Sequence, residues 1–350
     1  MLRDRDAVVT PEGIILRVYG YDHPPRAYVC DAEYAHESIY RSGDPRALRE
    51  GKEGKFYKFY EDEGLKFVAR HFPRYTIYYD PLNTKLVGVR EGEGEARRTD
   101  ERLRVLLKEP RDPLVEALRE LLDLVLDRSS LSEEDFGIFG SLQHGFHHPA
   151  YSDLDLVIYG GKNLDELRKL LREIYLENNG FVKNEFEEAP PIGRWRFINY
   201  SVDEYLKHQR RKLIYAVFNS HKLGRMVKVE FEPVKSWDEI VNEYELYGRI
   251  VQEGMVTLIA RVVDDRGAGY MPSIYLIEVE EVLEGPKAYD VERIVSYVEE
   301  FRLQAFKDEK ILVKGWLEKV EGKRSFKQIT LTRRERYYEQ VVKVLEGIDQ

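Results

Sequence analysis

Cysteine is almost missing from this sequence, and long apolar runs are missing altogether. Cys30 is the single cysteine among 350 residues, which excludes an internal disulfide and a cysteine-rich zinc site. No apolar run reaches the roughly 18 residues that a transmembrane helix needs. The opening residues, MLRDRDAVVTPEG, also lack the apolar stretch of a signal peptide. Together these absences predict a cytoplasmic protein.

Methionine, asparagine and glutamine are scarce as well, whereas charged residues make up 34% of the chain. This balance is typical of proteins from hot-growing organisms, so we expect a thermophilic source. The net charge of −9 argues against a protein whose whole surface is coated by nucleic acid. Local basic patches remain compatible with that total, and they matter more for nucleic-acid binding.

The chain length and the changes in pattern along it predict three domains. Residues 1–108 alternate short β-like runs with turns and form a β-rich domain of unknown role. Residues 109–249 carry alternating helices and strands, including a helix opened by Pro113 and a helical stretch at about 201–219. The charged segment 91–113 looks like a linker with room for a short helix. We therefore expect an α/β (α+β) chain with a β-rich N-terminal domain.

Residues 250–350 have a different character from the rest of the chain. Strand-like runs surround a Gly-rich turn and a basic turn, and the segment YDVERIVSYVEEF between them is interpreted as a helix. Strands, one helix and further strands are typical of a small β-barrel of the OB type. Four clear strands are visible where that fold needs five.

Two aspartates interrupt an apolar run in SDLDLVIYG, which has the pattern of a buried strand. Asp153 and Asp155 are two residues apart, so their carboxylates project from the same face of that strand. Paired carboxylates suit a hard divalent cation, which would also offset their mutual repulsion. A third carboxylate is expected from the strand RMVKVEFEPV, where Glu230 is the first choice and Glu232 the reserve. Two metal ions held in this way can stabilise both oxygens of a displacement at phosphorus.

A glycine and a serine stand between the preceding strand, FGIF, and the aspartates. Gly140 allows the backbone to come close to a ligand, and Ser141 opens what should be a short helix. A helix N-terminus and a hydroxyl can then hold a phosphate. The histidines that follow, His144, His147 and His148, are interpreted as loop residues near the nucleotide or as plain surface residues, with a zinc site less favoured.

Gly-Ser, eleven residues and then Asp-x-Asp resemble the signature of the DNA polymerase beta superfamily of nucleotidyltransferases. The order of helix, strand, Gly-Ser, strand, helix and distant carboxylate strand is similar too, over residues 112–235. The segment GSLQHGFHHPAYSDLDLVIYG further resembles a group of archaeal predicted nucleotidyltransferases, a likeness that extends over most of the chain.

The resemblance implies a role for each matching position. Gly140 and Ser141 would contact the triphosphate of an NTP. Asp153 and Asp155 would bind metal, expected to be two Mg²⁺ ions for which Mn²⁺ can substitute. Glu230 would complete the metal site and activate the attacking hydroxyl. The superfamily often has aspartate at this last position, and a chain in which neither glutamate reaches the metals would be a degenerate member.

Two segments are rich in basic and aromatic residues. Residues 194–228 carry a local charge of +7 with Trp195, Tyr200, Tyr205 and Tyr215 interleaved, and residues 319–336 carry +5 beside Trp316 and Phe326. Such segments can bind triphosphate or single-stranded nucleic acid, although solvated helix and hairpin surfaces remain the alternative. The nucleotide-binding candidates are Arg210, Arg211 and Lys212. The nucleic-acid-binding candidates are Arg194, Lys207, Trp316, Lys323 and Arg324.

The sequence thus predicts an enzyme that moves a nucleotidyl group from an NTP to a hydroxyl acceptor and releases pyrophosphate. RNA, either tRNA or an RNA 3′ end, is the favoured acceptor because of the two basic segments. A small molecule or a protein hydroxyl is the alternative acceptor. A catalytically inactive RNA-binding protein on the same scaffold is the alternative from another functional class. The sequence does not predict the oligomeric state, the base preference or whether the reaction is templated.

Overall fold

The computed structural model describes residues 1–108, 112–177, 180–187, 195–333 and 336–347. The fold is mixed α/β with several sheets, and the chain divides into two compact units. The first contains residues 1–79, 83–183 and 216–244, and the second contains residues 80–82, 184–215 and 245–350. The boundaries expected near residues 108 and 249 stay a prediction.

The N-terminal part of the first unit is an eight-stranded sheet with one α-helix, α1 (Glu63–His71). Strands pair in the order β4-β5-β3-β2-β1-β8, and β7 joins β3 to β6. The strands are β1 (Ala7–Val9), β2 (Ile14–Val18), β3 (Ala27–His36), β4 (Leu48–Gly51), β5 (Gly54–Lys58), β6 (Thr76–Tyr79), β7 (Thr84–Arg90) and β8 (Glu95–Arg97).

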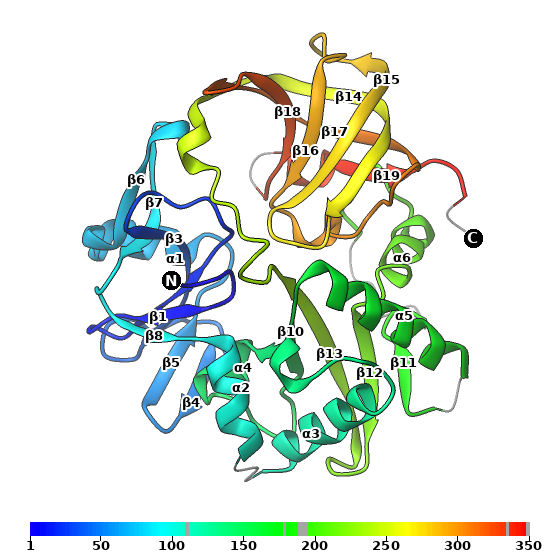
Figure 1. The fold of residues 1–350 in the computed structure, drawn as a ribbon. Helices are drawn as coiled ribbons and strands as arrows, with labels where there is room; N and C mark the ends of the chain where they lie inside the picture. Colours follow the sequence, from blue (N-terminus) through cyan, green and yellow to red (C-terminus); the bar gives the residue numbers. More distant parts are fainter. Residues whose placement is uncertain (109–111, 178–179, 188–194, 334–335, 348–350) are drawn as a thin grey trace. The chain divides into compact units, whose positions relative to one another are not determined.

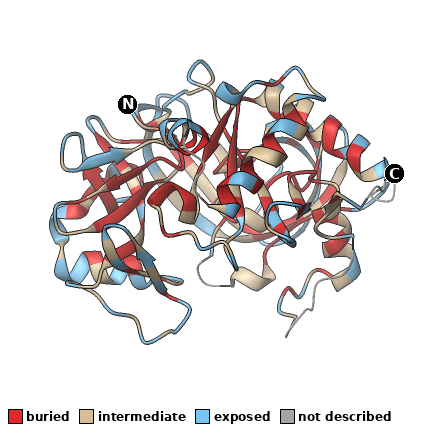
Figure 2. Ribbon diagram, turned by 90° about the horizontal axis from the view of Figure 1, so that it is seen from below, coloured by how far each residue is buried: buried red, intermediate tan, exposed pale blue. Residues whose placement is uncertain are grey.

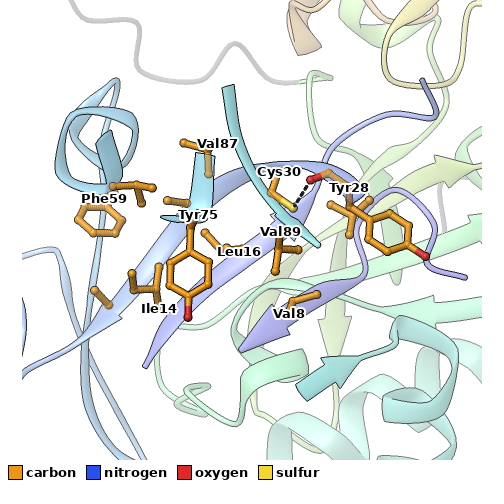
Figure 3. Packing of buried hydrophobic residues seen from close by; sticks show 13 residues of the cluster. Val8, Ile14, Leu16, Tyr28, Cys30, Phe59, Tyr75, Val87 and Val89 are labelled. Atoms are coloured by element: carbon orange, nitrogen blue, oxygen red, sulfur yellow. Dashed lines mark hydrogen bonds between the residues drawn. The ribbon is translucent and has the colours of Figure 1, made fainter. Parts of the chain in front are cut away.

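A cluster of buried apolar side chains forms the core of this sheet region. Strands β1, β2, β3 and β7 contribute Val8, Leu16, Cys30 and Val89, which lie close together in Figure 3. The Cys30 thiol is buried and donates to the carbonyl oxygen of Tyr28, and burial raises the pKa of this thiol. The single cysteine is therefore a core residue.

The central sheet has five strands in the order β11-β12-β13-β10-β9. Its strands are β9 (Phe136–Ile138), β10 (Leu154–Tyr159), β11 (Val182–Asn184), β12 (Tyr215–Ser220) and β13 (Arg225–Val234). Neighbouring helices are α2 (Thr99–Lys108), α3 (Pro113–Leu126), α4 (Gly140–His144) and α5 (Gly161–Glu177). In Figure 2 the helices present a buried face and an exposed face, as amphipathic helices do. Helix α2 packs against β9, and α5 packs against β10.

Local signals set several of these boundaries. Helix α3 begins at Pro113, where the Asp112 side chain accepts from the backbone N–H groups of Leu114 at 2.9 Å and Val115 at 3.1 Å. The segment expected as a linker instead holds β8 and α2, while residues 109–111 lie outside the described residues. The helix expected up to residue 219 ends earlier, since α6 covers Val202–Arg210 and β12 starts at Tyr215.

The second unit is built mainly from six strands. They are β14 (Tyr247–Gly267), β15 (Ser273–Glu284), β16 (Val291–Ser296), β17 (Lys310–Gly322), β18 (Phe326–Leu331) and β19 (Val341–Val344). The pairing runs β14-β15-β16-β18-β17, and β17 pairs again with β14, which closes a circle of five strands (Figure 1). Strands β16 and β18 are parallel, and the other pairs of the circle are antiparallel.

The helix predicted at YDVERIVSYVEEF is wrong. Its first half is strand β16, paired with both β15 and β18, and only Glu299–Phe301 form a short 3₁₀ turn. The apolar spacing of Val291, Ile294 and Val295 suits a helix face and a buried strand alike. β-Branched residues favour the strand, and burial between two neighbours decides it. Strand β16 is the fifth strand that the sequence pattern did not reveal.

Within the described residues, no helix is both long enough and apolar enough to cross a lipid bilayer.

Candidate functional site

The carboxylate site is built on two neighbouring parallel strands at the centre of the five-stranded sheet. Asp155 of β10 is the register partner of Glu230 of β13, so both side chains project from the same face. Asp153 stands just before β10, two residues from Asp155, and is exposed, whereas Asp155 and Glu230 are half-buried. The strand register thus places Asp155 opposite Glu230.

The electrostatic environment of Asp155 is unfavourable to its negative charge. Burial and, after it, the negative charge of Asp153 raise the pKa of Asp155 to about 7. Lys58 and Arg5 act in the opposite direction, while Glu33 adds to the rise. The ionised form of a carboxylate beside another carboxylate is stabilised when a cation binds, because the cation offsets the repulsion between the two negative charges.

Glu232 has a different role from Glu230. Its side chain is buried, with 1% exposed, and it accepts from the Arg5 guanidinium at 2.5 Å. The Arg5 guanidinium also lies over the ring of Phe139, the residue before Gly140. A buried carboxylate that already has a hydrogen-bonded cation is a poor metal ligand, which counts against Glu232; the choice of Glu230 as third carboxylate stays a prediction.

The Gly140–Ser141 turn lies directly against Asp155. The backbone N–H of Phe139 donates to the carbonyl oxygen of Asp155 at 3.0 Å, which joins the end of β9 to β10. Gly140 has φ +63°, and a Cβ at this position would overlap Asp155 Oδ2. Only glycine lets the turn come this close to the carboxylate. Ser141 is half-buried at the start of α4.

The donor set is suitable for a divalent cation, since Asp153, Asp155 and Glu230 offer oxygen ligands. The three are not gathered into a cage: across the residues that the structure describes, no group of three or more His, Cys, Asp or Glu side chains is arranged to hold a metal ion. Asp155 and Glu230 are aligned by their strands, and burial is the first cause of the raised pKa of Asp155, with the charge of Asp153 second.

The three histidines do not converge on the carboxylates or on one another. His144 is buried in α4 between the rings of Tyr34 and Phe146, and burial lowers its pKa to about 3. His147 Nε2 lies 2.9 Å from Asp112 Oδ2. His148 is exposed and stacks on Tyr151. The interpretation of His144 as a loop or surface residue is therefore wrong, because it packs into the core through α4.

The first basic segment is divided between the two units at Tyr215, and the nucleotide-binding candidates Arg210, Arg211 and Lys212 lie in the second unit, where they are engaged. Lys212 is fully buried and donates to the carbonyl oxygen of Glu300 at 2.7 Å. Arg211 pairs with Glu309, and Arg210 donates to the carbonyl oxygen of Phe186. Their assignment to nucleotide binding stays a prediction, and these contacts count against Arg211 and Lys212.

Lys207 and Arg194 are the nucleic-acid-binding candidates of this segment. Lys207 of α6 pairs with Asp203 at 3.3 Å. Arg194 lies outside the described residues.

The second basic segment is compensated by acidic residues of neighbouring strands and turns. Its ion pairs are Lys319–Glu321, Arg324–Glu292, Lys327–Asp290, Arg333–Glu300 and Arg336–Glu339. Lys323 is exposed and Trp316 is half-buried on β17. Arg334 and Glu335 lie outside the described residues. Among the described basic residues of this segment, five of the six therefore have an acidic partner, and Lys323 is the exception.

Part of the chain that carries this geometry is similar to a known protein family. Residues 118–208 match the nucleotidyltransferase domain family. The match contains Gly140, Ser141, Asp153 and Asp155, and it ends before Glu230. The resemblance to nucleotidyltransferases is thereby confirmed for this segment.

A relative of similar length comes from Methanocaldococcus jannaschii. The uncharacterized protein MJ1086 of this archaeon is 26% identical over 350 residues, which cover 97% of this chain and 98% of the relative. No solved structure matches the chain significantly. The resemblance to archaeal proteins over most of the chain, which was expected from the sequence, is confirmed by this relative.

Sequence reasoning missed the contribution of the N-terminal region to this site. Arg5 contacts Glu232, a residue 227 positions away, and Lys58 acts electrostatically on Asp155. The only available signal was the run Arg3-Asp4-Arg5-Asp6, whose four side chains are buried despite their charges. Charged residues directly before a strand usually face solvent, so the signal was too weak to use.

Proposed function

We propose that this protein is a metal-dependent nucleotidyltransferase that moves a nucleotidyl group from an NTP to a hydroxyl acceptor. The observation that carries the proposal is the pairing of Asp155 with Glu230 beside a glycine turn that closes on Asp155. The family match of residues 118–208 supports the reaction class.

Each group has a defined task in this reaction. Asp153 and Asp155 would hold Mg²⁺, expected as two ions, which supplies charge stabilisation at the attacking and leaving oxygens. The acceptor oxygen forms a bond to the α-phosphorus, and the bond from that phosphorus to the bridging oxygen of the β-phosphate breaks. Glu230 takes the proton of the acceptor hydroxyl, and pyrophosphate leaves. Gly140 and Ser141 hold the β- and γ-phosphates through backbone N–H groups and the hydroxyl.

RNA is the acceptor that we propose, because of the second unit. Its closed circle of five strands has the number of strands of an OB-like barrel, a fold that binds single strands. The guanidinium of Arg293 on β16 lies 4.6 Å from the ring centroid of Phe326 on β18, and Arg293 Nη2 donates to the hydroxyl of Tyr247 on β14 at 3.0 Å. With exposed Lys323 nearby in sequence, this group offers a stacking surface and cations to RNA, whereas Arg324 would have to leave Glu292 to contribute.

The test is incubation with each of four α-labelled NTPs, Mg²⁺ and total RNA from a thermophilic archaeon. We expect labelled RNA from at least one NTP, and no label with Asp153→Ala, because an exposed ligand is removed without disturbing the core. Asp123→Ala, an exposed aspartate of α3, is the matched control and should keep full activity.

Two other outcomes of this experiment would each favour one of the alternative functions. Pyrophosphate release without labelled RNA would point to a small-molecule or protein hydroxyl. RNA binding that Asp155→Asn leaves unchanged, with no pyrophosphate release from any NTP, would identify an inactive RNA-binding protein on this scaffold.

A further inference from the structure

A hairpin of the N-terminal region lies against the segment that follows the Gly140–Ser141 turn. Phe146, just beyond α4, packs against Phe56 of β5 at 4.9 Å and against Tyr34 of β3 at 5.4 Å between ring centroids. These residues form one buried cluster. At Gly51 of β4, a Cβ would come within 2.8 Å of Phe146 Cδ1, so the hairpin has no room for a side chain there. Strands β3, β4 and β5 therefore form a wall beside the turn.

Lys58 lies on the face of this wall that packs against the segment after the turn. It is two residues from Phe56 on β5 and is the register partner of Tyr34, so all three side chains share one face. Both aromatic neighbours contact Phe146 from that face. Independently, the charge of Lys58 acts on Asp155 and opposes the rise of its pKa. The ammonium group thus lies on the side of β5 that faces both the turn and Asp155.

Lys58 is not neutralised by an ion pair with a neighbouring carboxylate of the described residues. Within the described part of the chain, Lys58 forms no ion pair, although it is half-buried. Arg5, the other cation that acts on Asp155, already binds Glu232. A half-buried ammonium group directed at a site is stabilised when an anion binds there. The groups of an NTP that carry such charge are its phosphates.

We propose that Lys58 binds the triphosphate of the NTP, so that the N-terminal region forms the cationic wall of the nucleotidyl-transfer site. The inference rests on the proposed function and assigns a role to residues outside the segment that matches the family. The metal ligands and the Gly140–Ser141 turn hold the phosphates from the sheet side, and Lys58 holds them from the hairpin side. Charge-assisted contacts of this kind add affinity for the phosphate tail and none for the base.

The test measures binding of Mg²⁺–tripolyphosphate, by displacement of a fluorescent ATP analogue, to wild type and three variants. Lys58→Met keeps the aliphatic stem and should weaken tripolyphosphate roughly 10- to 100-fold, because it removes one charged hydrogen bond. Lys58→Arg should restore affinity to within a few-fold of wild type. Lys55→Met is the matched control, since Lys55 lies on the opposite face of β5 and pairs with Glu50 at 2.7 Å, and its affinity should be unchanged.

Protection from amine acetylation provides a second measurement that needs no variant. Mg²⁺–tripolyphosphate should protect Lys58 of the wild-type protein, and Lys55 should react equally with and without it. Unchanged tripolyphosphate affinity in a folded Lys58→Met protein, or no protection of Lys58, would overturn the inference.

The two proposals fail in different ways. If wild type incorporates label and Asp153→Ala does not, but Lys58→Met binds tripolyphosphate normally, only the role of Lys58 is refuted. If wild type binds neither NTP nor tripolyphosphate, the proposed function fails and this inference with it.

Discussion

At the scale of single residues, the carboxylate site depends on a glycine as much as on its acids. Gly140 adopts φ +63° and leaves no space between its Cα and Asp155 Oδ2. Replacing it by alanine adds left-handed backbone strain of about 1–2 kcal/mol and pushes the Asp155 carboxylate aside. We expect Gly140→Ala to lower NTP incorporation by about 10²-fold, the usual cost of misplacing a catalytic group by about 1 Å.

Gly224 provides the matched control for this prediction. It has nearly the same backbone angle, φ +62°, and a Cβ there would meet nothing within 4 Å. Gly224→Ala should lose similar stability in denaturant unfolding and keep its activity. Equal activity in the two variants would show that the close approach of Gly140 to Asp155 is unimportant.

At the scale of elements, strands with long, regular patterns could be predicted and a short ambiguous one could not. The alternation in RMVKVEFEPV predicted β13, and its register with β10 places Glu230 opposite Asp155. The same pattern could not tell Glu230 from Glu232, because both share one face. The ion-pair partner of Glu232, Arg5, comes from the first residues of the chain. For β16, a spacing compatible with helix and strand was decided by its neighbours β15 and β18.

The strand assignment of β16 leads to a prediction about stability. Ile294 is fully buried and pairs with Tyr275 and Ile329 on the two adjacent strands. Ile294→Ala should lower the free energy of unfolding of the second unit by about 2–5 kcal/mol, because a cavity opens at the centre of the sheet. Hydrogen exchange of the β15 and β18 amides measures this change.

Glu292 of the same strand is exposed and pairs with Arg324 at the surface. Glu292→Ala should therefore cost only about 0–1 kcal/mol in the same experiment. Comparable losses in the two variants would contradict the central position of β16.

At the scale of the whole molecule, buried histidines make stability depend on pH. Burial lowers the pKa of His144 to about 3 and the pKa values of His23 and His208 to about 4. Between an ordinary histidine pKa of about 6.5 and these values, the unfolded chain binds protons that the folded chain does not. The contribution of these three histidines to the free energy of unfolding is therefore complete above about pH 6.5 and is lost as the pH drops below it.

His144→Gln tests this pH dependence, because it removes one of the three histidines that bind a proton in the unfolded chain but not in the folded chain. Between about pH 6 and pH 4, the unfolding free energy of the variant should fall less steeply than that of wild type, by about 1.4 kcal/mol per pH unit. Urea unfolding at several pH values gives both slopes. Parallel curves would mean that His144 titrates normally in the folded protein.

The sequence by itself determined the parts of this protein that depend on local spacing. Gly140, Ser141, Asp153 and Asp155 stand within sixteen residues of one another, and their separations along a turn and a strand follow from backbone geometry. The family match agrees with that reading.

Only the tertiary structure decided which charged side chains are neutralised and which residues of opposite charge neutralise them. Arg5 binds Glu232 across 227 positions, β3 and β5 bring Lys58 to the side of Asp155, and acids from other strands and turns neutralise most of the second basic segment. The physical reason is that electrostatic interactions depend on distance in space, and strand pairing brings together charges that are far apart along the chain.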